Sequence, residues 1–323
     1  MTKKWQIYEI TPEKQEEINK LEKEYNLNTL LATILVNRGI TKKEEIEIFL
    51  HPTRHNFHNP FLMPDMEIAV QEILKAIESK EKIIIYGDYD ADGITSITVL
   101  KSFFEDLGLD VDYYIPNRLD EGYGLNKPAI EKIVNEKYDL MITVDCGISA
   151  IEEIEYANEL GLKTIVTDHH EVGESLPNAI AVVDAKRKDN VYPCRDLAGV
   201  GVVFKLIQAL SIKLNLKEES YLKYLDIVCV GTISDIVPLK DENRVITKLG
   251  LLLVNQTKNI GLKSLLYSSG YKNIDSMAIS FGVAPRINAC GRMGHAEKAL
   301  QLFLSKNINE VNQLTKELNE FNR

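Results

Sequence analysis

The stretch KIIIYGDYDADGITS, residues 82–96, decides the fold. Its isoleucines at 83–85 form an unbroken apolar run, which is typical of a strand buried on both faces of a parallel sheet. Three aspartates, Asp88, Asp90 and Asp92, follow within five positions, and a helical pattern comes next. A buried strand, an acidic turn and a helix in this order predict an α/β protein whose site lies at the strand end.

The same alternation continues on both sides of this stretch. Short apolar strands are expected at residues 82–87, 111–116, 139–145, 163–168 and 179–184, and amphipathic helices at residues 66–79, 94–108, 126–136 and 150–161. Strands rich in Ile, Val and Leu that alternate with helices predict a doubly wound, mostly parallel sheet covered on both faces.

Helical segments flank this region. We expect a helical N-terminal segment over residues 1–66, a catalytic domain over 67–300, and the start of a long connecting helix over 301–323. The last helical pattern, residues 296–323, stops without a capping glycine or proline. We therefore expect that the chain was shortened or is a fragment whose downstream domains are absent.

Composition limits the class of protein. The formal net charge is −10, and 45% of the residues are apolar. No apolar run approaches the roughly 20 residues of a membrane span, and the N-terminus lacks the apolar core of a signal peptide. We expect a cytoplasmic protein with no membrane partner and four buried, reduced cysteines. The acidic balance argues mildly against a protein that coats nucleic acid by counterion release.

Polar residues follow several of the apolar runs. They are Asp88, Asp90 and Asp92 after the first strand, Asp145 after the third, Asp168, His169 and His170 after the fourth, and Asp235 after a later run. We expect all of them at strand ends of one sheet, where open α/β sheets bind ligands. A lone DxD is usually a loop or a helix cap, and a lone HH pair usually lies on the surface. Their occurrence together favours a site.

The acidic residues predict a centre with two cations. Asp90 and Asp92 are two positions apart, so in an extended segment both side chains face one site, before Gly93 turns the backbone. Converging carboxylates repel one another unless cations lie between them. Two divalent cations would neutralise four carboxylates, and an imidazole from His169 favours Mn²⁺ while leaving Mg²⁺ open. Such pairs, about 3.5 to 4 Å apart, hydrolyse phosphoesters.

Two further clusters offer cations to a phosphate. GVAPRINACGRMGHAE, residues 282–297, is expected to be a loop carrying Arg286 and Arg292, although a structural turn with exposed arginines explains it equally well. IPNRLDEGYGLN, residues 115–126, places Arg118 after the second strand to bind phosphate, and Tyr123 to stack on a base.

The motifs together resemble a known family. GDYDADGITS, VDCG, DHH and GTISD, in this order, are similar to the motifs of the DHH phosphoesterase superfamily. With NRGI, FLMPDM, IPNRLDEGYG and APRINACGRMG, the chain resembles bacterial exonucleases of that superfamily that are specific for single-stranded DNA. The resemblance implies a Mn²⁺- or Mg²⁺-dependent enzyme that degrades single strands from the 5′ end and releases mononucleotides in repair and recombination.

The resemblance also implies a role for each residue. Asp90 and Asp145 would hold one metal, Asp145 would bridge to a second one completed by Asp92, His169 and Asp235, and Asp88 is a further ligand or support. His170 would contact the scissile phosphate, Asp168 would orient the two histidines, Arg118 and Tyr123 would bind the 5′ end, and Arg286 and Arg292 would contact phosphates. The attacking group would be a metal-activated water. A monomer is expected, with a helicase or single-strand-binding protein as a partner.

Other functions stay open on the sequence alone. The alternatives are a nanoRNA and 3′-phosphoadenosine-5′-phosphate phosphatase of the same superfamily, a family II pyrophosphatase, and a non-catalytic nucleic-acid-binding module. Members of the family continue into a DHH-associated domain and an oligonucleotide-binding fold, which are not found in this sequence. We therefore expect an intact metal site with weakened binding of DNA.

Overall fold

The computed structural model describes residues 9–323, which form two compact units, one up to Asn56 and one from Phe57. The first contains α1 (Pro12–Tyr25), α2 (Thr29–Asn37), α3 (Lys43–Leu50) and the short η1 (Arg54–Asn56). Its helices enclose a small core of their own, which includes Leu21, Leu35 and Ile46. The expected divisions at residues 66 and 300 stay predictions.

The second unit is built on a parallel sheet of five strands in the order β2-β1-β3-β4-β5. The strands are β1 (Ile83–Gly87), β2 (Asp112–Tyr114), β3 (Leu140–Val144), β4 (Lys163–Thr167) and β5 (Ala181–Val183). The chain adds β2 on one side of β1 and then β3 on the other. The carboxyl ends of β1 and β3 therefore border the crevice where such sheets bind ligands.

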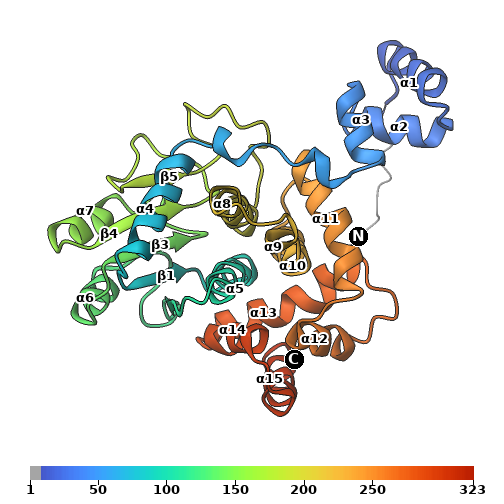
Figure 1. Cartoon of the computed structure of the whole chain (residues 1–323). Coiled ribbons are helices and arrows are strands. Elements are labelled where there is room, and N and C mark those ends of the chain that lie inside the picture. The colour runs from blue at the N-terminus through green and yellow to red at the C-terminus, as the bar shows by residue number, and fades with distance from the viewer. Residues whose placement is uncertain (1–8) are drawn as a thin grey trace, which may run out of the picture. The chain divides into compact units, whose positions relative to one another are not determined.

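Helices cover both faces of this sheet, as the sequence predicts. The covering helices are α4 (Met66–Glu78), α5 (Ala91–Asp106), α6 (Lys127–Asn135), α7 (Ile151–Glu159) and α8 (Gly199–Lys213). Along β1, Ile83 and Ile85 belong to a core shared with α4, α5 and α8, whereas Ile84 belongs to a core shared with α6 and α7. Figure 1 shows α6 and α7 on one side of the sheet and α5 and α8 on the other.

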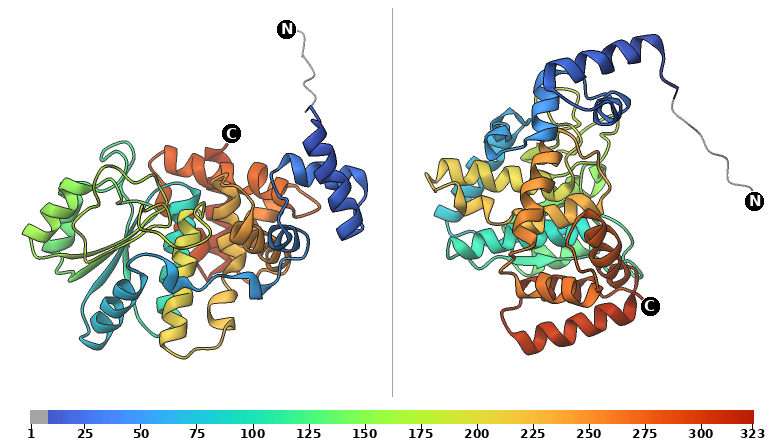
Figure 2. Two further views of the ribbon diagram at one scale, coloured as in Figure 1. Left: turned by 90° about the horizontal axis from the view of Figure 1, so that it is seen from above. Right: turned by 90° about the vertical axis from the view of Figure 1, so that its right-hand side faces the viewer.

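The rest of the unit is helical. It comprises η2 (Pro60–Leu62) before α4, and then α9 (Glu219–Leu222), α10 (Leu225–Ser234), α11 (Asp241–Val254), α12 (Ile260–Ser269), the π-helical η3 (Ala278–Val283), α13 (Ala284–Arg292), α14 (Ala296–Leu304) and α15 (Ile308–Phe321). The helices from α10 onwards gather beyond α5 and α8, away from the sheet (Figures 1 and 2).

The last helical pattern differs from the expectation of one continuous helix. The chain leaves the helical conformation after α14, and the Asn307 side chain accepts a hydrogen bond from the Asn309 amide to start α15. The intervening Ser305 hydroxyl also accepts a bond from the Asn307 amide, so polar side chains replace helical bonds at the break. Among residues 9–323, no helix combines the length and apolar character that a membrane crossing needs.

Candidate metal centre

The aspartates after β1 lie on a turn and on the start of a helix. The Asp90 carboxylate caps α5 by accepting hydrogen bonds from the amides of Asp92 and Gly93 at 2.9 and 3.0 Å. The prediction that Asp90 and Asp92 share an extended segment is therefore wrong, because capping starts the helix at Ala91 and places Asp92 in its first turn. A Cβ on Gly93 would lie 2.4 Å from the Asp88 carbonyl oxygen, so this glycine lets the first turn of α5 pack closely against the turn before it.

A second helix fixes the Asp92 side chain. The amides of Gly199 and Val200, at the start of α8, donate hydrogen bonds of 2.6 and 2.9 Å to its two carboxylate oxygens. The start of a helix carries free N–H groups and a partial positive charge, which suits a carboxylate. Asp92 is 2% exposed, so this anchoring holds a buried carboxylate in one orientation.

Asp145, directly after β3, lacks comparable support. Its backbone adopts the left-handed conformation at φ 60°, which Asp tolerates better than most residues. The side chain is 2% exposed, and its Oδ1 accepts no well-aligned hydrogen bond from the described residues, although His169 Nε2 lies 3.0 Å away. A Cβ on Gly199 would lie 2.4 Å from that oxygen, so only a glycine leaves room for it. A buried carboxylate oxygen without a well-aligned donor is suited to a cation.

The residues after β4 form a tightly bonded group. The Asp168 carboxylate accepts hydrogen bonds from the amides of Ile148 and His169 at 2.9 and 2.7 Å. Its Oδ1 also lies 2.7 Å from His170 Nδ1, so this nitrogen carries the proton. Asp168 therefore orients the segment that carries both histidines.

Asp235 reaches the same site from a different kind of element. It follows α10, the helix that the pattern of residues 221–236 predicts, so the expectation that Asp235 also lies at a strand end of the sheet is wrong. The run before Asp235 forms a helix that packs on α5 and α11.

His169 lies between three of the carboxylates. Its Nε2 is 3.0 Å from Asp145 Oδ1 and 3.7 Å from Asp92 Oδ2, and its Nδ1 is 3.7 Å from Asp235 Oδ2. Burial, followed by the charge of His170, lowers the pKa of His169 to about 4. The imidazole is therefore neutral near pH 7, which is the form that binds metals.

The side chains make two sets with metal-binding spacing. Asp88, Asp90 and Asp145 bring one carboxylate oxygen each within 4.8 Å of one another, and Asp92, His169 and Asp235 do the same. A third set, which overlaps the first two, joins Asp145, Asp168, His169 and His170. We favour the first two sets for cations, because Asp168 is already saturated with hydrogen-bond donors.

Burial, followed by repulsion between neighbouring carboxylates, raises the pKa values of the acids in the cluster. Burial, followed by the charge of Asp90, raises the pKa of Asp88 to about 7 and that of Asp235 to about 6. Burial and the neighbouring carboxylates raise the pKa values of Asp92 and Asp145 well above the ordinary range. A divalent cation removes this repulsion, so the acidic residues fit a metal centre.

A cavity of about 240 Å³ opens beside the first set. It is lined by Asp88, Tyr89, Asp90, Arg118, Tyr123, Asn288 and Arg292. Three of the residues predicted to bind substrate, Arg118, Tyr123 and Arg292, are thus brought to the acidic cluster. The Tyr123 hydroxyl lies 3.4 Å from His170 Nε2, and the Arg118 guanidinium stands 5.5 Å from the Tyr89 ring.

Arg286 is not brought to this cavity. Its Nε donates a 2.5 Å hydrogen bond to Asn319, and its Nη1 donates to the Gly282 carbonyl. The expected loop around Arg286 and Arg292 is instead the helix α13, so the two arginines, six positions apart, point in different directions.

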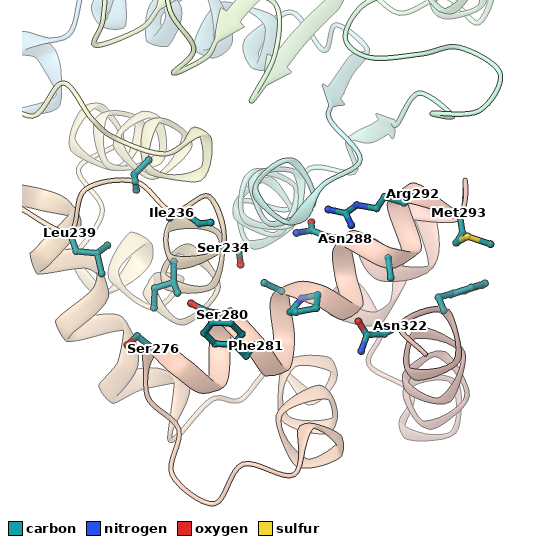
Figure 3. A pocket seen from close by; sticks show the side chains of 16 residues that line it. Ser234, Ile236, Leu239, Ser276, Ser280, Phe281, Asn288, Arg292, Met293 and Asn322 are labelled. Carbon is teal, nitrogen blue, oxygen red and sulfur yellow. The ribbon is translucent and has the colours of Figure 1, made fainter. Parts of the chain in front are cut away.

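A larger apolar groove of about 770 Å³ adjoins the cavity through two shared residues, Asn288 and Arg292. Figure 3 shows the groove between the end of α10 and the η3–α13 segment, with Ile236, Phe281 and Met293 among its walls. Ile236 is 87% exposed and follows Asp235 directly. The groove therefore extends the site along the protein surface.

Several residues of the site were not predicted from the sequence. Asp184, after β5, is fully buried, its Oδ2 finds no partner among residues 9–323, and burial raises its pKa to about 7. The sequence signal that points to Asp184 is its position directly after an apolar strand, where ligand sites of such sheets lie. Gly199 contacts a residue more than 50 positions away in the chain, and Asn288 contacts one more than 190 positions away. No local sequence pattern reveals such contacts.

Comparison with known proteins identifies the family. The DHH family N-terminal domain matches residues 82–232. The chain is 42% identical to the single-stranded-DNA-specific exonuclease RecJ of Bacillus subtilis over 98% of its own length and 40% of that protein. It therefore spans less than half of this relative.

Two solved structures share the fold. A crystal structure of exonuclease RecJ bound to manganese is 37% identical, with a TM-score of 0.75 over 80% of this chain and 66% of the other. RecJ of Thermus thermophilus in complex with Mn²⁺ is 32% identical, with a TM-score of 0.79 over 95% of this chain and 44% of the other. The predicted family is thus confirmed, and this chain belongs to the DHH family, with RecJ as its relative over almost its whole length.

Proposed function

We propose that this chain hydrolyses the phosphodiester bonds of single-stranded DNA from the 5′ end and releases mononucleotides in DNA repair and recombination. The observation that carries the proposal is the pair of ligand sets built from residues after β1, β3, β4 and α10, with the Asp145 oxygen, which accepts no well-aligned hydrogen bond, between them. The similarity to exonucleases named for single-stranded DNA supports the choice of substrate.

The two sets would hold two Mn²⁺ or Mg²⁺ ions. Asp88, Asp90 and Asp145 would bind one ion, and Asp92, His169 and Asp235 the other, with Asp145 close enough to His169 to serve both. When bound, such cations activate a water for attack and neutralise the charge that develops on the phosphate. The Gly199 and Val200 amides keep Asp92 oriented.

His170 is placed to contact the scissile phosphate. Asp168 accepts a hydrogen bond from His170 Nδ1 and raises the pKa of the imidazole, which favours its protonated form. The Nε2–H then faces Tyr123, which lines the cavity, and can donate to a phosphate oxygen there. Asp168 contributes by orientation and charge, since its own oxygens are occupied.

Arg118, Tyr123 and Arg292 would bind the strand. All three line the cavity next to Asp88 and Asp90. The arginines offer planar donors to phosphate, and the Tyr123 ring, on a residue that is 55% exposed, offers a face on which a base can stack. Arg286 stays a weaker proposal as a phosphate contact, because Asn319 and Gly282 already occupy its guanidinium.

The remaining expectations are finer proposals. We propose a monomer in the cytoplasm that works with a helicase or a single-strand-binding protein. Size-exclusion chromatography and binding to these proteins in purified form would test the assembly.

Digestion of strands labelled at either end tests the activity. With Mn²⁺, we expect 5′ to 3′ release of mononucleotides, loss of this activity in Asp145→Ala, and normal activity in Asp110→Ala, whose side chain is 96% exposed. Release of phosphate from 3′-phosphoadenosine-5′-phosphate without digestion of DNA would favour the phosphatase. Equal digestion by Asp145→Ala and the unsubstituted chain would contradict the proposal.

A further inference from the structure

Helix α13 contacts the acidic turn after β1 from the side opposite to the sheet. Asn288, Gly291 and Arg292 lie on one face of α13, three and four residues apart. Each meets the segment of residues 88–91 or the cavity next to it. Figure 3 shows Asn288 and Arg292 projecting together from α13.

Asn288 supplies the hydrogen bond that the start of α5 lacks. The Asp90 side chain caps the amides of Asp92 and Gly93, and the Asp90 carbonyl accepts from the Ile94 amide. The remaining amide of this turn, Ala91 N–H, donates to Asn288 Oδ1 at 2.8 Å. The first-turn amides of a helix have no partner within the helix, so this donor needs an acceptor from elsewhere.

Gly291 brings α13 against the backbone of the same turn. A Cβ at this position would lie 2.2 Å from the Tyr89 carbonyl oxygen. Tyr89 stands between Asp88 and Asp90, so the contact falls between two predicted ligands of the first set. Backbone contact and the Asn288 hydrogen bond together restrict how far residues 88–91 can shift.

The element before α13 sets the direction of this face. The π-helical η3 runs directly into α13, with Pro285 at its start. An extra residue in a helical turn rotates the following helix by about 100°. The π-helical turn therefore selects which residues of α13 face α5.

Different helices therefore hold the two ligand sets in position, and we call each such contact a brace. The start of α8 holds Asp92 of the second set, whereas α13 holds the turn that carries Asp88 and Asp90 of the first. Loss of one brace should affect one set more than the other.

We infer that Asn288 is a positioning residue that sets the metal affinity of the Asp88–Asp90–Asp145 set by anchoring the Ala91 amide. The inference rests on the proposed function, because it assumes that this set binds a cation. Groups that orient metal ligands typically change metal affinity by about 10- to 100-fold when removed.

Titration with Mn²⁺ in the absence of nucleic acid tests the inference. We expect Asn288→Ala to lower the affinity for one of the two bound Mn²⁺ ions about tenfold. Asn288→Asp keeps an acceptor oxygen and should retain the affinity for that ion. Asn322→Ala is the matched control, because Asn322 lines the same groove as Asn288 and caps α15 through its backbone.

Two backgrounds identify which ion is affected. In Asp235→Asn the second set is damaged, and Asn288→Ala should then weaken the ion that remains. In Asp90→Asn the first set is damaged, so Asn288→Ala should change little further.

Three results would overturn the inference. The first is an affinity of Asn288→Ala for Mn²⁺ within twofold of that of Asn322→Ala. The second is an equal loss of affinity for both ions. The third is weaker binding of DNA with unchanged binding of Mn²⁺. An unsubstituted chain that binds no Mn²⁺ would contradict the proposed function and the inference with it. If Asn288→Ala does not fold, Asn288→Asp still decides, because a tenfold loss in that variant contradicts a role through the acceptor oxygen.

Discussion

Asp145 and Asp168 are two buried carboxylates at the ends of neighbouring strands, β3 and β4, with opposite electrostatics. Asp145 is 2% exposed and Asp168 is 1% exposed. Burial alone would raise the pKa of Asp168, but the hydrogen bond and charge of His170, with two backbone amides, hold it below its ordinary value. Burial and the charges of Asp92 and Asp90 raise the pKa of Asp145 well above its ordinary value.

Asp168 has a buried charge that hydrogen-bond donors of the fold satisfy, whereas the buried charge of Asp145 lacks such donors and is suited to a cation. A buried charge is stable when donors surround it, and costly when they do not. Asp168 stabilises the folded chain by itself. Asp145 is costly to ionise in the metal-free chain, because it is buried among like charges, and this supports the proposal that it binds a cation.

Asp145→Asn should have the largest effect on activity. We expect digestion of single-stranded DNA to fall about 1,000-fold or more, because the carboxylate between the two sets loses its charge. The metal-free variant should gain about 1 to 2 kcal/mol in free energy of unfolding, since repulsion is relieved and Asn also tolerates φ 60°. Chemical denaturation in a chelator measures this gain, and a loss of stability would contradict the comparison.

Asp168→Asn should behave in the opposite way. The metal-free free energy of unfolding should fall by about 2 to 4 kcal/mol, because the Ile148 and His169 amides and His170 lose a charged acceptor. Activity should fall only about 10- to 100-fold, since Asp168 acts through orientation of the histidines. The same denaturation series is the measurement. A variant as stable as the unsubstituted chain would show that Asp168 is not part of the structural framework.

The pH dependence should follow the acids of the cluster. Asp88 and Asp235, with pKa values of about 7 and 6, hold more protons in the folded metal-free chain than in the unfolded one. Their contribution to stability without metal should therefore fall as pH rises from about 4 to about 7. His169, which is neutral when folded but protonated below about pH 6.5 when unfolded, contributes a rise over about pH 4 to 6.5, so the net fall should be clearest from about pH 6.5 to 7.5.

Mn²⁺ should reverse this trend. Cations bind the ionised acids, so affinity should rise about tenfold per pH unit for each proton released, up to about pH 7. Calorimetry in buffers of different ionisation enthalpy counts the protons. Binding without proton release would contradict the raised pKa values.

Tyr123→Phe should have the smallest effect. His170 Nδ1 lies 2.7 Å from Asp168 Oδ1, whereas His170 Nε2 lies 3.4 Å from the Tyr123 hydroxyl. Asp168 therefore does most to orient the His170 ring. We expect activity within about threefold of the unsubstituted chain, because a long hydrogen bond is weak. A loss comparable to that of Asp168→Asn would mean that Tyr123 shares the task of orienting His170.

The sequence predicted most of the fold because its strands are unusually clear. Short uninterrupted runs of β-branched residues such as Ile83–Ile85, alternating with amphipathic helices, favour buried parallel strands, and all five expected strands formed. Since parallel strands place their carboxyl ends at one edge, the acids and histidines that follow β1, β3 and β4 could be grouped before any coordinates were known.

The remaining features depend on contacts that local patterns do not encode. The pattern of residues 221–236 predicts the helix before Asp235, but it does not show that the end of this helix, and not a strand end of the sheet, brings the carboxylate to the site. Asp90 became a helix cap, and Arg286 turned away from the cavity once α13 replaced the expected loop. The Asn288 bond to Ala91 joins residues 197 positions apart, and no spacing in the sequence marks it.

The most direct measurement is the number of Mn²⁺ ions bound per chain without nucleic acid, at about pH 8, which is above the pKa values of Asp88 and Asp235. We predict that the unsubstituted chain binds two ions and that Asp168→Asn also binds two, but with lower affinity. Asp145→Asn should lose tight binding. Binding by Asp145→Asn equal to that of the unsubstituted chain would contradict the claim that the Asp145 carboxylate is the centre of a two-metal site.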